Sequence, residues 1–115
     1  MKKPILLMLN PWFDNGGQGP FYCPDCGILE GFLAYNPDIR KQLEIIYVDY
    51  KRPRQKIIKY LGAENQESPV LVLEDSNQVL DGVKKSFSTG KTYIDNPILM
   101  CNYLGKRFKG VNLHP

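Results

Sequence analysis

The heptapeptide FYCPDCG at residues 21–27 places two cysteines in C-x-x-C spacing at the start of an apolar helical pattern. Pro24 suits the first helical position because it has no N–H to leave unpaired and its φ angle is already set. Cys23 then caps the helix, where unpaired backbone N–H groups and the positive end of the helix dipole stabilise a thiolate. We therefore expect Cys23 to be a nucleophile and Cys26 to resolve its mixed disulfides. Asp25 adds an anion at the same helix end and should temper this effect, giving a weaker oxidant.

The composition favours one soluble globular domain over residues 1–115, with 43% hydrophobic and 23% charged residues. No apolar run reaches the roughly 18 residues that a membrane span requires. We expect a bacterial-type cytoplasmic location, where two close thiols are more often catalytic or metal-binding than structural. Basic clusters at 51–59 and 106–109 lack a nucleic-acid-binding motif. They are interpreted as solvated helix faces, with an anion-recognising edge as the alternative.

Apolar runs and turn formers predict elements in the order βαβα followed by ββα. The predicted strands cover residues 4–9, 43–49, 70–74 and 78–80, and the predicted helices cover 24–35, 53–61 and 97–109, with a further helical turn at 38–42. Because a strand, a helix and a strand within about 45 residues form a right-handed unit with parallel strands, the thiols should lie at the carboxyl end of the first strand.

Two long polar loops are predicted at residues 10–20 and 81–95. The first runs directly into Cys23 and should lie over the dithiol, because long loops in compact domains are often functional. It carries Trp12 and Phe13, which either shield the thiols or fill the core. Core filling is favoured for one of them, since large aromatic side chains are mostly inside proteins.

Zinc binding is an alternative use of the cysteines. Cys23, Cys26, Cys101 and His114 supply the ligand types of a zinc site, but a second closely spaced pair is missing. Cys101 lies on the apolar stripe of the last predicted helix and is interpreted as a buried, inert residue. His114 is interpreted as a solvated tail residue. We therefore expect no metal.

The element order, the Cys-Pro-x-Cys motif and the proline before the third strand resemble the thioredoxin/glutaredoxin superfamily over nearly the whole chain. More closely, the chain resembles an uncharacterised bacterial thioredoxin-fold family. The motifs that carry this resemblance are FYCPxC at 21–26, Glu30-Gly31, RPR at 52–54, Asn65-Gln66, SPVLVL at 68–73 and the closing His114-Pro115. The resemblance implies an α/β fold: a βαβ-ββα three-layer sandwich around a central four-stranded mixed sheet.

The same resemblance implies the site. Cys23 and Cys26 become the catalytic pair, and Pro69 becomes a cis-proline that faces them, although an ordinary strand start at Ser68-Pro69 fits the sequence equally well. The implied substrate-binding residues are Tyr22, Pro24, Ser68, Pro69, Val70 and Asp95. Glutaredoxins usually place a lysine upstream of their cysteines for the glycyl carboxylate of glutathione. Residues 19–22 offer none, which leaves Arg52 or Arg54 as replacement cations.

Two functions remain open from the sequence. The first is thiol-disulfide exchange with a disulfide-bearing protein or glutathione, renewed by a reductase or a small-thiol reductant. The second is a glutathione- or partner-binding module with little turnover, which is suggested by Asp25 and the missing lysine. Neither reading needs a cofactor beyond glutathione as a candidate co-substrate, and neither involves nucleic acid or a membrane.

Overall fold

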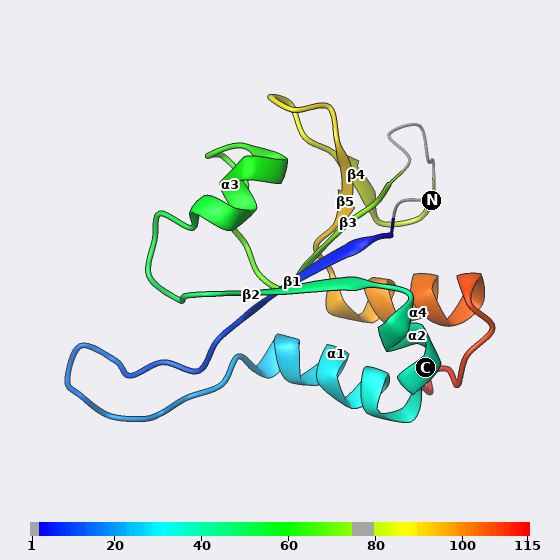
Figure 1. Ribbon diagram of the computed structural model, residues 1–115, viewed down its shortest axis with the longest axis horizontal. Coiled ribbons are helices and arrows are strands. Elements are labelled where there is room, and N and C mark those ends of the chain that lie inside the picture. Colours follow the sequence, from blue (N-terminus) through cyan, green and yellow to red (C-terminus); the bar gives the residue numbers. More distant parts are fainter. Residues whose placement is uncertain (1–2, 75–79) are drawn as a thin grey trace.

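The computed structural model describes residues 3–74 and 80–115 of the protein. Within these residues the chain forms a five-stranded mixed sheet and four helices (Figure 1). The elements are β1 (Ile5–Leu9), α1 (Pro24–Tyr35), α2 (Pro37–Lys41), β2 (Glu44–Val48), α3 (Gln55–Leu61), β3 (Val70–Val72), β4 (Val83–Lys85), β5 (Thr92–Ile94) and α4 (Pro97–Arg107). None of the helices in this part of the chain has both the length and the apolarity needed to cross a bilayer.

The strand order is β2-β1-β3-β5-β4. β1 is parallel to β2, while β3 runs antiparallel to both β1 and β5, and β4 is antiparallel to β5. Leu6, Leu7 and Met8 of β1 are all fully buried. Because successive strand residues point to opposite faces, both faces of the sheet centre must be covered. Figure 1 shows α1 and α4 on one side of the sheet and α3 on the other.

Helix α1 has the bounds that its sequence predicts. Pro24 occupies its first turn, Cys23 is its N-cap, and the helix ends at Asn36, whose successor is a proline. The buried Asn36 side chain then joins the helix to the C-terminal segment. Its Nδ2 donates to the carbonyls of Phe32 and Val111, both at 2.9 Å, and its Oδ1 accepts from the Val111 N–H at 2.7 Å.

The prediction of a mixed α/β protein is confirmed, but the prediction of four strands is wrong because the sheet has five. The segment 81–95, expected to be a long loop, contains the hairpin of β4 and β5. β4 lacks an apolar run, since two of its three residues are lysines, as is common on an edge strand. Of the predicted strand at 78–80, residues 78 and 79 lie outside the described residues, and Leu80 is not in a strand.

Helix α3 begins two residues later than predicted. Its first residue is Gln55 and its N-cap is Arg54, so Pro53 precedes the helix instead of opening it. The Arg52-Pro53 peptide bond is cis. The predicted stop at Gly62 is confirmed, because this residue caps α3 with a φ of 85°, a conformation that glycine adopts without steric cost.

Candidate functional site

The Cys23 sulfur lies at the N-terminus of α1. Cys23 is the N-cap with an extended backbone, and its Sγ accepts a hydrogen bond from the Cys26 backbone N–H at 3.1 Å. The two residues are 7% and 5% exposed, and no disulfide joins them. A helix N-terminus offers N–H donors and a positive dipole end, so this sulfur is held where an anionic form is stabilised.

Cys26 lies deeper and is electrostatically different from its partner. Its Sγ accepts the Leu9 N–H at 3.5 Å. Burial, followed by the hydrogen bond with Cys23, raises the pKa of the Cys26 thiol to about 12, and the Leu9 N–H and then the Ser68 side chain only partly oppose this shift. Cys26 therefore stays protonated near neutral pH, as the second, resolving thiol of an asymmetric pair would be.

Cys23 lines an open groove of about 900 Å³, which we call the dithiol groove. Its walls come from four parts of the chain. They are Leu9 at the end of β1, residues 11–15, residues 49–52 with Arg54, and Glu67 with Ser68, beside Cys23 and Pro24. The carboxyl ends of the parallel strands β1 and β2 lead into this groove, which is where open α/β sheets commonly bind ligands.

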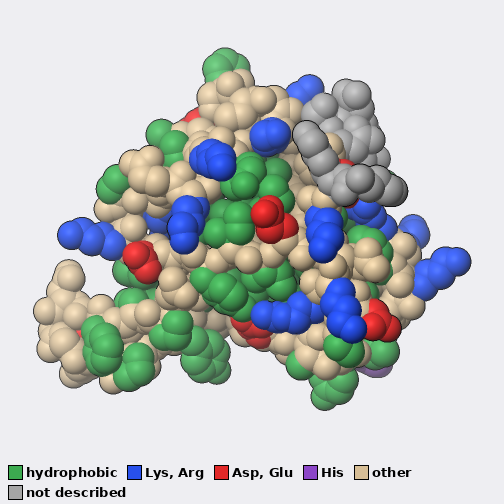
Figure 2. Space-filling model, viewed as in Figure 1, with side chains coloured by type: hydrophobic (Ala, Val, Ile, Leu, Met, Phe, Trp, Pro, Cys, Tyr) green, Lys and Arg blue, Asp and Glu red, His purple; other side chains and the backbone are tan. Residues whose placement is uncertain are grey.

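One wall of the groove belongs to a hairpin that projects from the sheet beside the start of α1 (Figure 1). Trp12 and Phe21 exchange two backbone hydrogen bonds of 3.0 and 2.7 Å, and Asp14 Oδ1 accepts the N–H groups of Gly16 and Gln18 at 3.0 and 2.8 Å. Figure 2 shows hydrophobic side chains along this projection, at the lower left. The segment predicted to lie over the thiols thus stands beside them as a wall.

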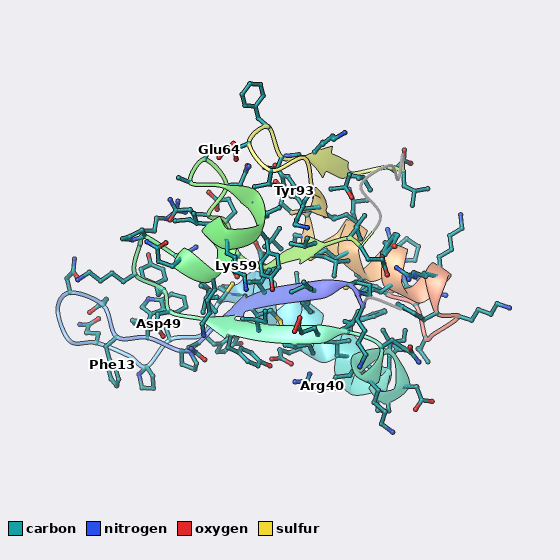
Figure 3. The ribbon with its side chains drawn as sticks, turned by 45° about the horizontal axis from the view of Figure 1, so that its top comes forward. Phe13, Arg40, Asp49, Lys59, Glu64 and Tyr93 are labelled. Atoms are coloured by element: carbon teal, nitrogen blue, oxygen red, sulfur yellow. The ribbon has the colours of Figure 1, made fainter. Side chains whose placement is uncertain are left out.

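The two aromatic residues of this hairpin have different environments. Trp12 is half-buried, packs against the core and stacks on Tyr50, with ring centroids 4.3 Å apart and planes at 13°. Phe13 is 63% exposed and points away from the sheet (Figure 3). Asp49, next to Tyr50, lies near the base of the hairpin in the same view. The stack therefore ties the hairpin to the segment that follows β2.

Arg54 is the only charged residue that is buried among the described residues, at 7% exposure. Its Nε and Nη2 donate to the Tyr50 carbonyl at 3.0 and 2.8 Å, and its Nη1 donates to the Gln66 carbonyl at 2.8 Å. It forms no ion pair with a described carboxylate, whereas Arg52 pairs with Glu67 at 3.4 Å. Burial, and then the neighbouring Arg52, lower the pKa of the Arg54 guanidinium.

Some of the predicted substrate-binding residues lie in the dithiol groove. Pro24 and Ser68 line it together with Cys23. The Ser68-Pro69 peptide bond is cis, and the Ser68 hydroxyl donates to the Leu7 carbonyl at 3.0 Å. These residues come from α1 and from the segment before β3, so the fold brings two sequence-distant motifs to the same site.

Other predicted binding residues lie outside the groove lining. Tyr22 is 73% exposed, and its ring covers Gly27 on α1. Val70 is buried and lines a small separate void with Asp95, whose carboxylate forms an ion pair with Lys84 at 3.0 Å. Asp95 is therefore already engaged by a cation of the neighbouring strand β4.

Sequence reasoning overlooked Tyr50 as a groove residue. This residue directly follows the end of β2, and the carboxyl ends of parallel strands lie at one edge of the sheet. The rule that located the cysteines at the end of β1 could therefore have located Tyr50 as well. Its partnership with Trp12 carries no local sequence signal.

The third cysteine is remote from solvent. Cys101 is fully buried on α4, and burial raises the pKa of its thiol to about 11. In residues 3–74 and 80–115, no three histidine, cysteine, aspartate or glutamate side chains come together as a metal site would require. His114 lies in the exposed C-terminal segment. Cys23 is thus the cysteine that lines the groove, with Cys26 buried next to it.

Comparison with known proteins gives a match to one family model. The sequence model of a family described as protein of unknown function, DUF3088, matches residues 3–112. No curated protein and no solved structure is significantly similar to the chain. Because the match spans β1 to α4 and includes both Cys23 and Cys26, the chain belongs to the DUF3088 family.

Proposed function

We propose that the protein is a thiol-disulfide oxidoreductase in which Cys23 is the nucleophile and Cys26 the resolving thiol. The observation that carries this proposal is the position of the Cys23 Sγ, which caps α1, accepts the Cys26 N–H at 3.1 Å and lines an open groove. A capped, groove-lining sulfur with a second thiol one helical turn away has the parts that exchange with an external disulfide requires.

The strand order supports a thioredoxin-like assignment of the fold. β1, α1 and β2 form a parallel βαβ unit, and β3, β5 and α4 follow as an antiparallel ββα unit. Together they give the order β2-β1-β3-β5, with β4 as an additional edge strand. This layout is compatible with the βαβ-ββα sandwich that the sequence resemblance implies, and it puts the Cys-Pro-x-Cys motif at the first helix.

The proposed reaction has two steps. The Cys23 thiolate attacks one sulfur of a substrate disulfide, forming a mixed disulfide and releasing the other sulfur as a thiolate, which takes a proton from water. The Cys26 thiol then loses its proton to water and attacks the Cys23 sulfur, which closes the Cys23–Cys26 disulfide and releases the second substrate thiolate. The substrate gains two electrons and the dithiol loses two, and an external thiol or dithiol restores the reduced protein.

A binding module with little turnover is the second candidate. It is favoured by the high pKa of Cys26, about 12, because a resolving thiol that rarely ionises slows the second step. In that case the Cys23 thiolate attacks a partner disulfide, such as oxidised glutathione, and releases one partner thiol, and the mixed disulfide persists. The stacked Trp12 and Tyr50 and the buried Arg54 then serve to bind the partner.

Reduction of insulin and of hydroxyethyl disulfide by the wild type, Cys23→Ser and Cys26→Ser distinguishes these functions. If the protein is an oxidoreductase, the wild type reduces both substrates and Cys23→Ser reduces neither. Cys26→Ser then accumulates a mixed disulfide that mass spectrometry detects. Cys101→Ala is the matched control, since this thiol is buried on α4. Equal background rates for the wild type and Cys23→Ser contradict the proposed activity, and a stable mixed disulfide in the wild type favours the binding module.

A further inference from the structure

A buried guanidinium lines the same groove as the proposed nucleophile. Arg54 is 7% exposed, its guanidinium donates to the neutral backbone carbonyls of Tyr50 and Gln66, and it lies 5.4 Å from the centre of the Tyr50 ring. Carbonyl oxygens satisfy N–H groups but do not neutralise a full positive charge. Buried charges in proteins are normally paired, because removing an ion from water is costly. The position of Arg54 therefore calls for an anion nearby.

The carboxylates of the groove are already engaged elsewhere. Glu67 forms its ion pair with Arg52, at 3.4 Å, and acts on Arg54 without forming an ion pair with it. Asp14 accepts two backbone N–H groups of its own hairpin, and Asp49 accepts the Asn10 side-chain amide at 3.3 Å. Lys51 is exposed, so water screens its charge. Among the described residues of the groove, Arg54 is thus the charge that is both buried and without a carboxylate partner.

Cys23 and Tyr50 are the uncharged groups of the groove that can become anions, and a thiol ordinarily does so more readily than a phenol. Cys23 lines the groove with Arg54, is itself 7% exposed, and contributes to the electrostatic environment of the guanidinium. We propose that Arg54 is the counter-ion of the Cys23 thiolate and acts as a positioning residue that stabilises the anionic, reduced form of the dithiol. This inference deepens the proposed function and rests on its assignment of Cys23.

A buried cation beside Cys23 changes the expected oxidising strength of the dithiol. Asp25 is exposed in the first turn of α1, where water screens its repulsion of the thiolate, whereas Arg54 acts from a buried position where electrostatic interactions are stronger. The charge of Cys23 exists in the dithiol and disappears in the disulfide. A buried cation therefore stabilises the reduced form selectively and makes the protein a stronger oxidant than the heptapeptide alone suggests.

The test is the rate at which Cys23 is alkylated by iodoacetamide, in a background of Cys26→Ala and Cys101→Ala so that one thiol reports. Arg54→Gln is expected to slow alkylation at neutral pH by about tenfold, because a smaller fraction of the sulfur is then the reactive thiolate. Arg54→Lys keeps the charge and should recover most of the rate. Lys106→Gln is the matched control, since this side chain is exposed on α4 and does not line the groove.

An Arg54→Gln variant that folds, by circular dichroism, and keeps the wild-type pH profile of alkylation overturns the inference. If Arg54→Gln does not fold, a second pair of variants that keeps Arg54 provides the test. Cys23→Asp carries an anion at neutral pH and should then melt at a higher temperature than Cys23→Asn, with the difference lost in acid, where the carboxylate is protonated. An Asn variant that is as stable as the Asp variant overturns the inference as well.

The outcome is independent of turnover. Alkylation requires no disulfide substrate, so a changed profile in Arg54→Gln supports the counter-ion even if the wild type reduces neither insulin nor hydroxyethyl disulfide. That combination of results contradicts the proposed oxidoreductase function and leaves the inference about Arg54 standing. If the wild type reduces both substrates and Cys23 is alkylated at the same rate in Arg54→Gln as in its parent, the inference about Arg54 is contradicted and the proposed function stands.

Discussion

The indole of Trp12 stacks on the phenol ring of Tyr50 with the ring centroids 4.3 Å apart, which joins the projecting hairpin to the segment after β2. Stacked aromatic pairs contribute about 0.5–1.5 kcal/mol beyond their buried area. Tyr50→Leu should therefore destabilise the fold by about 1 kcal/mol and raise the KM for a disulfide substrate, because the groove wall loosens. Urea denaturation and steady-state kinetics measure the two effects.

Tyr35→Leu is the control for this stack. Tyr35 is 77% exposed at the end of α1 and does not line the dithiol groove. It should change neither the stability nor the KM appreciably. An equal loss in both variants would mean that the stack does not support the groove.

The three cysteines should react in a definite order in the reduced protein. Burial holds the pKa of Cys26 at about 12 and that of Cys101 at about 11, so both remain protonated at neutral pH, and the thiolate is the reactive form. Iodoacetamide at about pH 8 should label Cys23 first, with the other two labelled only after unfolding in urea. Peptide mass spectrometry reads the order directly. Rapid labelling of Cys101 in the native protein would contradict its burial.

The raised pKa of Cys101 also predicts a loss of stability in alkali. An unfolded chain ionises this thiol near its ordinary value of roughly 8.5, whereas the folded chain keeps it protonated up to about 11. The folded state therefore binds more protons within that window. Its stability is complete below about pH 8.5 and falls by up to about 1.4 kcal/mol per pH unit as the pH rises toward the folded value.

Urea denaturation under reducing conditions at several alkaline pH values measures this effect. Cys101→Ala removes the thiol, so its stability should decline less steeply with pH than that of the wild type, whatever the cost of the substitution itself. Parallel declines for the two proteins would show that Cys101 does not contribute. The comparison of slopes cancels the titration of other groups, such as Tyr47 and Tyr93, whose pKa values are also raised by burial.

Asn36 should be a strong determinant of stability. Its buried amide makes three hydrogen bonds, to the Phe32 carbonyl and to both backbone groups of Val111. Asn36→Ala removes all three hydrogen bonds at once, one of them fully buried, so a loss of about 2–3 kcal/mol is expected in urea denaturation. Asn102→Ala, at an exposed position on α4, is the control and should cost less than about 1 kcal/mol. Similar losses in the two variants would refute a special role for Asn36.

Local signals predicted the elements around the dithiol well. Pro24 and the Asn36-Pro37 pair define both ends of α1, and the apolar runs of β1 and β2 need no partner to be recognised. β4 was missed because its lysine-containing segment becomes a strand only through pairing with β5.

In the candidate site too, some residues were predictable from local motifs and others depend on the tertiary fold. Cys23, Pro24 and Ser68 lie in recognisable motifs, and all of them line the groove. The Trp12–Tyr50 stack and the burial of Arg54 depend on which segments the sheet brings together, and no local pattern encodes that. The basic cluster at 51–59 was interpreted as a solvated face, yet one of its members is the buried cation of the groove.

The position of Trp12 has a practical consequence. It is the single tryptophan of the chain, and it stands in the wall of the groove. Its fluorescence therefore comes from one place, and a compound that enters beside Tyr50 alters the emission without any attached dye. The intrinsic fluorescence of Trp12 can thus be used to screen libraries of thiols and disulfides for binding before any substrate is identified.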